Sequence, residues 1–315
     1  MLLSGRPGLG RGWPVTHPAG WTAAEPCPSC GSWDITEYEI RVGSTESRMG
    51  WECRDCGHLA TWSTRAGTAP SLASQWQLLS VMPLHAITTM YGEQGLRERF
   101  ALEAARLTDP AARGQVKRAL RFAARLHASD RRQREPYVNH LLRVALRIMV
   151  HYSVREPDVI CAALFHDSVE DHAGDLSAAG RPGAFALLAA AYGERVAELV
   201  AAVTNPIYGP QSDSGSLYRE HVADSLAACR WARVIKISDF TDNGVGLIHT
   251  TGEKALRLAR KYAPLVPALA DLTARPDTPL TEEAKARILG QLRRASGRFD
   301  AIIAASRDST DFGGR

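Results

Sequence analysis

The chain has 315 residues, of which 45% are hydrophobic and 23% are charged, so it is long and apolar enough to bury a sizeable core. This composition excludes an intrinsically disordered or fibrous chain. Lys and Arg number 38 against 34 Asp and Glu, and the resulting net charge of +4 falls short of a nucleic-acid-binding composition.

The sequence contains no recognisable membrane anchor or secretory signal. No apolar run approaches the roughly 18 residues that a membrane helix needs. The first residues, MLLSGR, lack the apolar core of a signal peptide. We therefore expect a soluble, cytoplasmic protein.

Four of the six cysteines form two Cys-x-x-Cys pairs near the N-terminus, Cys27 with Cys30 and Cys53 with Cys56. Two such pairs can complete the tetrahedral four-sulfur shell that structural zinc prefers. Two disulfides would need an oxidising compartment, and a redox dithiol would need only one pair. The sequence therefore predicts a structural zinc ribbon over residues 21–66, preceded by a flexible leader at residues 1–20.

Short strand-like segments surround the cysteine pairs. Alternating polarity predicts a strand over residues 34–40, and residues 50–54 and 58–63 are short enough to be the other strands of a small ribbon. Residues 64–74 are rich in Ser, Thr, Gly and Ala, which is typical of a linker. We expect a domain boundary in this stretch.

Beyond the linker the pattern becomes helical. Residues 96–107 have helical spacing, and Asp109 with Pro110 predicts the N-cap and first turn of a helix that continues to about His127. No strand-like run of comparable strength follows, so the main domain is predicted to be all-α.

The last part of the chain is also predicted to be helical. Residues 281–290 and 291–305 read as two helices, followed by a polar tail at 307–315 that we expect to fray. The remaining cysteines, Cys161 and Cys229, are interpreted as small buried hydrophobic residues.

One helical segment gathers three acids and an imidazole. The stretch DVICAALFHDSVEDH can form a single helix that is capped by Asp158 and ends near Asp171. His166 with Glu170, and Asp167 with Asp171, are four residues apart and would project toward one side. Such groups repel one another unless a cation gathers them, so a divalent metal is one explanation. A solvated acidic helix end is the other.

Two further segments carry groups of the same chemistry. Upstream, RRQREPYVNH begins with the phosphate-binding charges of Arg131 and Arg132 and ends at His140. Downstream, ARVIKISDFTDN places Asp239 and Asn243 four residues apart, hence on one helical face.

In this order, the three segments resemble the HD-domain metal phosphohydrolases, and among them the RelA/SpoT-type hydrolases of the alarmone ppGpp. That family has Pro-Tyr-x-x-His after a basic stretch, then Leu-His-Asp-x-x-Glu-Asp, then Lys-x-x-Asp with an Asn four residues later. This chain reads EPYVNH, FHDSVED and KISDFTDN. The resemblance spans roughly residues 117–262.

The fold that the resemblance implies is mainly α, an HD-domain helical bundle preceded by the small β zinc-ribbon module. We place the HD phosphohydrolase domain at residues 110–270. A linker and helical connector would occupy residues 67–109, and C-terminal helices residues 271–306, before the tail.

The resemblance also assigns roles to individual residues. A mixed shell of imidazoles and carboxylates suits manganese or another hard divalent ion, and the acidic pair would position or deprotonate the attacking water. The implied residues are His140, His166, Asp167 and Asp239 as metal ligands, Glu170 and Asp171 as catalytic groups, and Arg131, Arg132 and Asn243 as substrate-binding groups, with Arg131 stacking on the guanine base.

The implied reaction is hydrolysis of the 3′-pyrophosphate of (p)ppGpp to GDP or GTP and pyrophosphate by a small stand-alone enzyme. The chain departs from the family pattern at Gln133, and at Phe240 and Asp242, where the family's common Asp-Arg-Leu-His-Asn reads DFTDN in this chain. A second hypothesis therefore keeps the metal but changes the substrate, for example to the 2′-phosphate of NADPH or a nucleoside monophosphate. A third hypothesis is a noncatalytic nucleotide sensor in which the zinc ribbon binds a partner.

The sequence does not identify the partner of the zinc ribbon. Residues 1–70 carry slightly more acidic than basic side chains, which weakens a nonspecific nucleic-acid role. We expect the ribbon to dock onto the helical domain or onto a protein partner, and a homo-oligomer is an alternative. The histidines outside the three motifs, including His127 and His172, are interpreted as surface or core residues.

Overall fold

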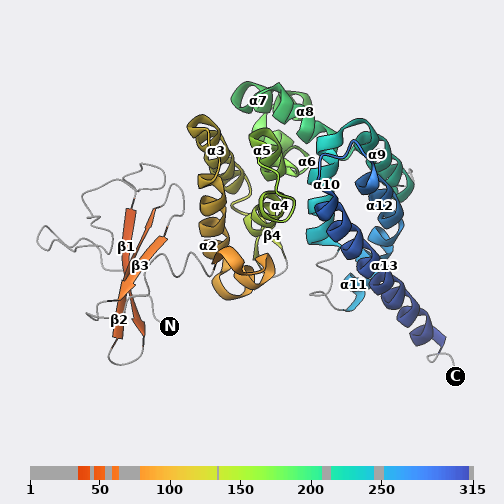
Figure 1. The fold of residues 1–315 in the computed structure, drawn as a ribbon, viewed down its shortest axis with the longest axis horizontal. Helices are drawn as coiled ribbons and strands as arrows, with labels where there is room; N and C mark the ends of the chain where they lie inside the picture. Colours follow the sequence, from red (N-terminus) through yellow and green to blue (C-terminus); the bar gives the residue numbers. More distant parts are fainter. Residues whose placement is uncertain are drawn as a thin grey trace, which may run out of the picture. The chain divides into compact units, whose positions relative to one another are not determined.

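The computed structural model of the protein describes residues 35–42, 46–53, 59–63, 79–132, 135–207, 214–244 and 252–311, and for the first three stretches it describes the backbone alone. The chain divides into two compact units, Met1–Arg106 and Leu107–Arg315. Figure 1 shows the strands in the first unit and the helical bundle of the second.

The first unit contains a three-stranded antiparallel sheet with β2 in the middle. Its strands are β1 (Ile35–Val42), β2 (Glu46–Cys53) and β3 (Leu59–Ser63). Tyr38 pairs with Gly50, which pairs in turn with Thr61. The strands lie where strand-like segments were expected, although β2 begins at Glu46 rather than Gly50.

The zinc ribbon stays a prediction. Cys27, Cys30 and Cys56 lie outside the described residues, and Cys53 ends β2 with a side chain that is likewise outside them. The leader and the expected linker also lie outside the described residues.

The first unit also contains a kinked helix, α2 (Leu84–Ala105). Gly92 adopts φ +62° and ψ −146°, a conformation that interrupts the helix and that glycine adopts without strain. After this kink the helix buries Leu96 and Phe100, as the helical spacing of this segment predicts.

The second unit is built of helices, drawn from yellow to blue in Figure 1. They are α3 (Pro110–Leu126), α4 (Val138–Val150), α5 (Pro157–Phe165), α6 (Ser168–Leu176), α7 (Gly180–Tyr192), α8 (Glu194–Val203), α9 (Ser214–Ala228), α10 (Arg230–Asn243), α11 (Gly252–Tyr262), the short 3-10 helix η2 (Ala263–Leu265), α12 (Val266–Ala274) and α13 (Glu282–Asp311). A two-residue antiparallel ribbon, β4 (Arg131–Arg132) with β5 (Glu135–Pro136), precedes α4. The expectation of a mainly helical domain is confirmed.

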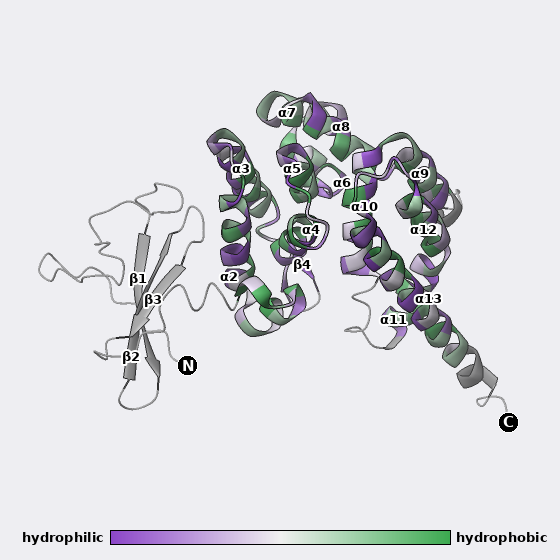
Figure 2. Ribbon diagram, viewed as in Figure 1, coloured by the Kyte–Doolittle hydropathy of each residue, from purple (hydrophilic) through white to green (hydrophobic). Residues whose placement is uncertain are grey.

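The core of this unit forms around α4 and α5. Every residue of α5 from Val159 to Phe165 is buried, because the helix is apolar on all sides. It packs against α3, α4 and α8, while α4 also packs against α10. Figure 2 shows hydrophobic and hydrophilic residues mixed around the longer helices, as amphipathic packing requires. The packing of α4, α5 and α10 fixes the elements that carry the polar motifs.

The start of α3 follows the sequence prediction. The Asp109 carboxylate accepts hydrogen bonds from the backbone amides of Ala111 and Ala112 at 2.9 and 3.2 Å, and Pro110 occupies the first turn. The helix ends at Leu126, with His127 as its C-cap.

The single helix predicted over residues 158–171 is wrong. Helix α5 ends at Phe165 and α6 begins at Ser168. The His166 imidazole Nδ1 lies 2.8 Å from the Ala163 carbonyl oxygen, so a side chain takes a backbone acceptor of the last turn. Asp167 then adopts φ −101° and ψ −7°, which is not regular helical geometry.

The expected cap of this helix is also wrong. Glu156 is the N-cap of α5, and Asp158 lies in the first turn. Its carboxylate contacts Arg195 at 3.4 Å instead of capping the backbone.

The C-terminal segment forms one helix rather than two. Helix α13 runs without interruption from Glu282 to Asp311, beyond the expected start of the tail, and residues 312–315 lie outside the described part. Cys161 is fully buried, as expected, whereas Cys229 is half-buried at the N-cap of α10. Among the described residues, no helix combines the length and the apolar character that crossing a bilayer requires.

Candidate functional site

Four side chains from three segments meet at one end of the α4, α5 and α10 core. His140 comes from α4 and Asp239 from α10, while His166 and Asp167 form the break between α5 and α6. The break matters because it lets two adjacent residues reach the same point, which a regular helix would separate by about 100°.

The ligand atoms of these side chains are close together. The Nε2 atoms of His140 and His166 are 3.2 Å apart, and they lie 3.4 and 3.6 Å from Oδ1 of Asp239. Asp167 Oδ2 lies 3.0 Å from Nε2 of His166 and 3.6 Å from Nε2 of His140. Both imidazoles and Asp239 are buried, and a group of His140, His166 and Asp239 has the composition and spacing of a cation site.

The second nitrogen of each imidazole, Nδ1, already has a hydrogen-bond partner. His140 Nδ1 lies 2.8 Å from Asp242 Oδ2, and His166 Nδ1 lies 2.8 Å from the Ala163 carbonyl. A proton on each Nδ1 satisfies these acceptors and leaves both Nε2 lone pairs facing the carboxylates. This donor set, with its occupied outer nitrogens, fits a divalent ion.

Further polar groups hold the two carboxylates. Tyr137 donates its phenolic hydrogen to Asp167 over 2.6 Å, and Asn243 donates from Nδ2 to Asp239 over 2.6 Å. The Lys236 ammonium lies 3.1 Å from Asp239. Burial alone would raise the pKa of Asp239, but the charge of Lys236 holds it well below its usual range.

The acidic pair Glu170 and Asp171 lies on the first turns of α6, beside this cluster. The Glu170 carboxylate accepts hydrogen bonds from the backbone amide of Asn205 at 3.1 Å and from its side-chain Nδ2 at 2.9 and 3.0 Å. Asp171 has no such fixed geometry, but partial burial of its carboxyl group and the negative charges of Asp167 and Glu170 raise its pKa to about 6. Its carboxylate therefore exchanges protons close to neutral pH.

A pocket of about 200 Å³ opens onto the cluster and the acidic pair. Cationic and aromatic side chains line its other side. The lysine ammonium groups of Lys236 and Lys261 lie 5.9 and 5.4 Å from the centre of the Tyr218 ring, and Lys261 is 5.4 Å from the ring of Tyr262. Positive charge beside aromatic faces suits a phosphorylated ligand that carries a base.

The two arginines of the basic motif have different positions. Arg132 lines the pocket, lies over the Tyr137 ring at 5.5 Å and donates to the side-chain oxygen of Asn243. Arg131 is exposed and is not among the lining residues, although it is adjacent in β4. Among the residues expected to bind the metal, act in catalysis or bind the substrate, the structure therefore brings together all except Arg131.

Comparisons with known proteins identify part of the second unit. Residues 119–225 match the HD domain family. Over 127 residues it is 33% identical to guanosine-3′,5′-bis(diphosphate) 3′-pyrophosphohydrolase MESH1 of Drosophila melanogaster, an alignment that covers 39% of this chain and 64% of that protein. The chain thus spans less than two thirds of the length of this relative.

A solved structure is also similar. It is described as a metazoan ortholog of SpoT that hydrolyses ppGpp and plays a role in starvation responses, and it shares 26% identity with this chain. The match covers 58% of this chain and 96% of that one, with a TM-score of 0.46.

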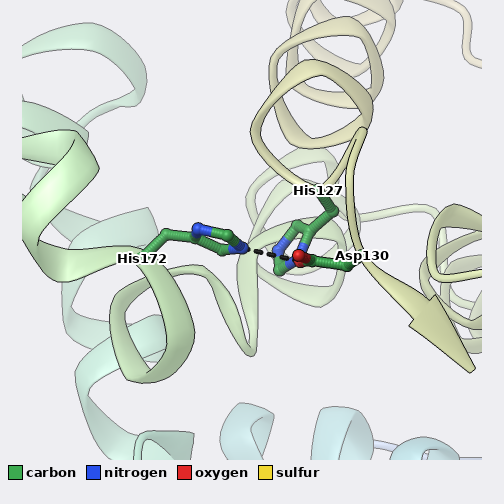
Figure 3. A group of neighbouring side chains, drawn as sticks. All are labelled: His127, Asp130 and His172. Atoms are coloured by element: carbon green, nitrogen blue, oxygen red, sulfur yellow. Dashed lines mark hydrogen bonds and ion pairs between the residues drawn. The ribbon is translucent and has the colours of Figure 1, made fainter.

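A second polar cluster lies within the residues that match the HD domain family, formed by His127, Asp130 and His172 (Figure 3). Asp130 Oδ2 lies 2.7 Å from both His127 Nδ1 and His172 Nε2, and His172 Nδ1 lies 2.8 Å from Asp175. These separations are those of short, direct hydrogen bonds. The second cluster is therefore a hydrogen-bonded chain that joins the end of α3 to α6.

Sequence reasoning missed several residues of the site. The sequence motifs contain Tyr137 and Lys236, but no role was predicted for either residue. Asn205, Tyr218 and Lys261 come from segments without a motif, because tertiary packing alone brings them to the pocket. The interpretation of His127 and His172 as isolated surface or core residues missed their link through Asp130.

Proposed function

We propose that this chain is a metal-dependent phosphohydrolase that removes the 3′-pyrophosphate of (p)ppGpp or of a closely related nucleotide. The observation that carries the proposal is that two imidazole Nε2 atoms, 3.2 Å apart, each lie within 3.6 Å of two carboxylates, those of Asp167 and Asp239, beside a pocket with cationic and aromatic walls. The HD domain match and the similarity to the Drosophila pyrophosphohydrolase support the same chemistry.

In this proposal His140, His166, Asp167 and Asp239 hold the metal, which we propose to be Mn²⁺ or another divalent ion. A bound divalent ion supplies Lewis-acid activation of a water molecule and of a phosphoryl oxygen. The protein residues supply a buried, preorganised shell, since Tyr137 and Asn243 orient the two carboxylates.

The acidic pair would act on the attacking water. Glu170 is fixed by Asn205 and can orient the water, while Asp171, with a pKa of about 6, is mostly ionised at pH 7 and can accept its proton. The water oxygen bonds to the phosphorus that carries the ribose 3′-oxygen, and the bond between that oxygen and phosphorus breaks. The freed 3′-oxygen takes a proton, so that the products are GDP or GTP and pyrophosphate.

The remaining pocket residues would bind the nucleotide. Arg132, Lys236 and Lys261 offer positive charge for its phosphates, and the rings of Tyr218 and Tyr262 offer flat surfaces for a base. Arg131 stacking on guanine, and Asn243 lining the nucleotide pocket, stay predictions from the family resemblance.

The test is pyrophosphate release from ppGpp by the purified chain with Mn²⁺, alongside pppGpp, NADPH, GTP and dGTP. We expect release from ppGpp that disappears in Asp167→Ala, because this substitution removes one carboxylate of the cluster. Asp277→Ala, which lies at a surface ion pair with Arg233, is the matched control and should retain activity. Absence of Mn²⁺-stimulated release from every nucleotide would refute catalysis and favour the nucleotide sensor.

A second candidate keeps the metal cluster and changes the substrate. It is favoured by Phe240, which is buried at the pocket and packs against the ring of Tyr262 at 5.6 Å, where the family pattern has an arginine. The loss of one cation there suits a ligand with fewer phosphates, such as NADPH or a nucleoside monophosphate. Phosphate release from one of these at a higher kcat/KM than from ppGpp would select this candidate.

The zinc site is a separate proposal. We propose that Cys27, Cys30, Cys53 and Cys56 bind one structural Zn²⁺, supported by their spacing and by the three-stranded sheet in the same segment. Metal analysis should give one zinc per chain, lost in Cys27→Ser. The docking role of this module, a homo-oligomer and the cytoplasmic location expected from the sequence stay predictions.

A further inference from the structure

Asp242 is a charged residue behind the cluster rather than in the pocket. Its side chain is only 4% exposed and belongs to α10, three residues after Asp239. Its carboxylate lies 2.8 Å from Nδ1 of His140, the nitrogen that faces away from the cluster. Asp242 is not among the residues that line the pocket.

The Asp242 carboxylate is also held by arginines of α4. Arg143 donates from Nε and a terminal nitrogen at 2.9 Å each, and Arg147 donates at 3.1 Å. Arg132 lies 3.5 Å away, and Arg143 also forms a bidentate pair with Glu135 at 2.7 and 2.8 Å. Two guanidinium groups thus fix both the charge and the orientation of this carboxylate.

The two imidazoles of the cluster therefore have different hydrogen-bond partners at Nδ1. His166 is held by a neutral backbone carbonyl, whereas His140 is held by an ionised carboxylate. A carboxylate on the outer nitrogen makes an imidazole a better electron donor at its other nitrogen, and the loss of such a partner weakens metal binding by about 10- to 100-fold.

We propose that Asp242 is a positioning residue, which keeps the His140 proton on Nδ1 and turns the Nε2 lone pair toward the metal cluster. The inference rests on the proposed function, because it assumes that the cluster binds a metal. Asp242, a negative charge that the family pattern lacks at this position, then supports the metal site although it does not line the pocket. The competing role for Asp242 is that of a structural counter-ion for Arg143 and Arg147 alone.

The test is Mn²⁺ affinity, measured by competition with a chelator on the full chain. Asp242→Asn should weaken Mn²⁺ binding by about 10- to 100-fold. The matched control is Asp277→Asn, because Asp277 also pairs with a buried arginine, Arg233 of α10, which is 1% exposed, through contacts of 2.7 and 2.9 Å. This control should keep the wild-type affinity.

A second pair of variants separates positioning from folding. Arg147→Met removes one cation beside Asp242, so the double variant Arg147→Met/Asp242→Asn has less uncompensated positive charge than Asp242→Asn and should unfold at a higher temperature. If Asp242 positions His140, the double variant still binds Mn²⁺ about 10- to 100-fold more weakly than Arg147→Met. This comparison decides the question even where Asp242→Asn alone fails to fold.

The outcomes distinguish the inference from the proposed function. Wild-type protein that fails to bind Mn²⁺ would refute the proposed function together with the inference. Wild-type binding with equal affinity in Asp242→Asn, or in the double variant relative to Arg147→Met, would overturn the inference alone. Long-range ¹H–¹⁵N spectra of the metal-free chain give an independent readout, since His140 should carry its proton on Nδ1 and lose this preference in Asp242→Asn.

Discussion

Tyr137 shows how one side chain connects the two polar clusters. Its hydroxyl donates to Asp167, and its ring stacks on His127 with the ring centres 4.9 Å apart. Burial and the neighbouring Asp167 charge raise the pKa of Tyr137, so the phenol stays protonated and remains a donor.

Tyr137→Phe should therefore weaken Mn²⁺ binding by about tenfold, because Asp167 loses the partner that orients it. The cost in folding stability should stay near 1 kcal/mol, the usual value of one hydrogen bond. Chelator competition and thermal unfolding measure the two effects. Tyr192→Phe, whose ring packs against Phe165 at 4.7 Å, is the control, and equal affinities in both variants would contradict this role.

Asp171→Asn should separate catalysis from metal binding. An amide cannot accept the proton of the attacking water, so kcat should fall by about 10²- to 10⁴-fold while Mn²⁺ affinity changes little. Initial rates at saturating ppGpp give kcat. A variant with wild-type kcat would show that Asp171 is not the proton acceptor.

At the residue scale, the sequence indicates which side chains lie close together where a motif fixes both residue type and spacing, while their roles stay proposals. His140, His166, Asp167 and Asp239 could be named because short patterns carry them, and the structure brings them together. Asn205 and Tyr218 could not be named, since nothing in their local sequence encodes their distance from Glu170 or Lys236.

At the scale of elements, the break between α5 and α6 is the main difference from the sequence-based expectation. Hydrophobic periodicity continues through this region, so it predicts one helix. At the break the His166 imidazole contacts the Ala163 carbonyl of α5 through Nδ1, while the partner of its Nε2, His140, comes from α4 and is not encoded locally. By contrast, the start of α3 was predictable because Asp109 and Pro110 are local signals.

Asp130→Asn should loosen the connection between α3 and α6 in a pH-dependent way. Burial lowers the pKa of His172, but the hydrogen bonds to Asp175 and Asp130 raise it above the ordinary value. A raised folded-state pKa gives stability that is complete below about pH 6.5 and is lost as the pH rises through the folded-state value. The melting temperature of Asp130→Asn should therefore fall further below wild type at pH 6 than at pH 9.

Thermal unfolding at the two pH values tests this expectation. The deprotonation of His172 removes its charge, so the ion pair with Asp130 is lost as the pH rises through the raised pKa of His172. Asp109→Asn should show the same small change at both pH values. Equal losses for Asp130→Asn at pH 6 and pH 9 would exclude a charged His172.

Asp109→Ala should cost about 1 kcal/mol of folding stability, because two backbone amides at the start of α3 lose their acceptor. For a unit of this size, that cost lowers the melting temperature by about 2–4 °C. Asp109→Ser keeps a side-chain acceptor and should remain close to wild type in the same melting experiment. A larger loss in the serine variant would assign the effect to the charge of Asp109.

At the scale of the whole molecule, every described residue of the cluster and pocket belongs to the unit Leu107–Arg315. The composition predicted enough apolar residues for a core, and the helical patterns predicted its class. The division of the chain after Arg106 depends on long-range contacts, which a local linker signal does not encode.

A fragment of residues 107–315 should therefore fold alone, bind Mn²⁺ and hydrolyse the same nucleotide as the full chain, with kcat/KM within about tenfold of it. Circular dichroism, chelator competition and pyrophosphate release test the three properties. Asp167→Ala in the same fragment is the inactive control. A folded fragment that binds Mn²⁺ but lacks activity would show that the unit Met1–Arg106 contributes to catalysis.

The arginine pair behind His140 restricts how this protein can evolve. A single substitution of Asp242 leaves Arg143 and Arg147 facing each other with one fewer anion, and a single loss of either arginine leaves Asp242 with less compensation. Substitution of Asp242 is therefore tolerated most easily in a sequence that has already lost one of the two arginines. Positions 143, 147 and 242 should consequently vary together among descendants of this sequence, while position 140 stays histidine.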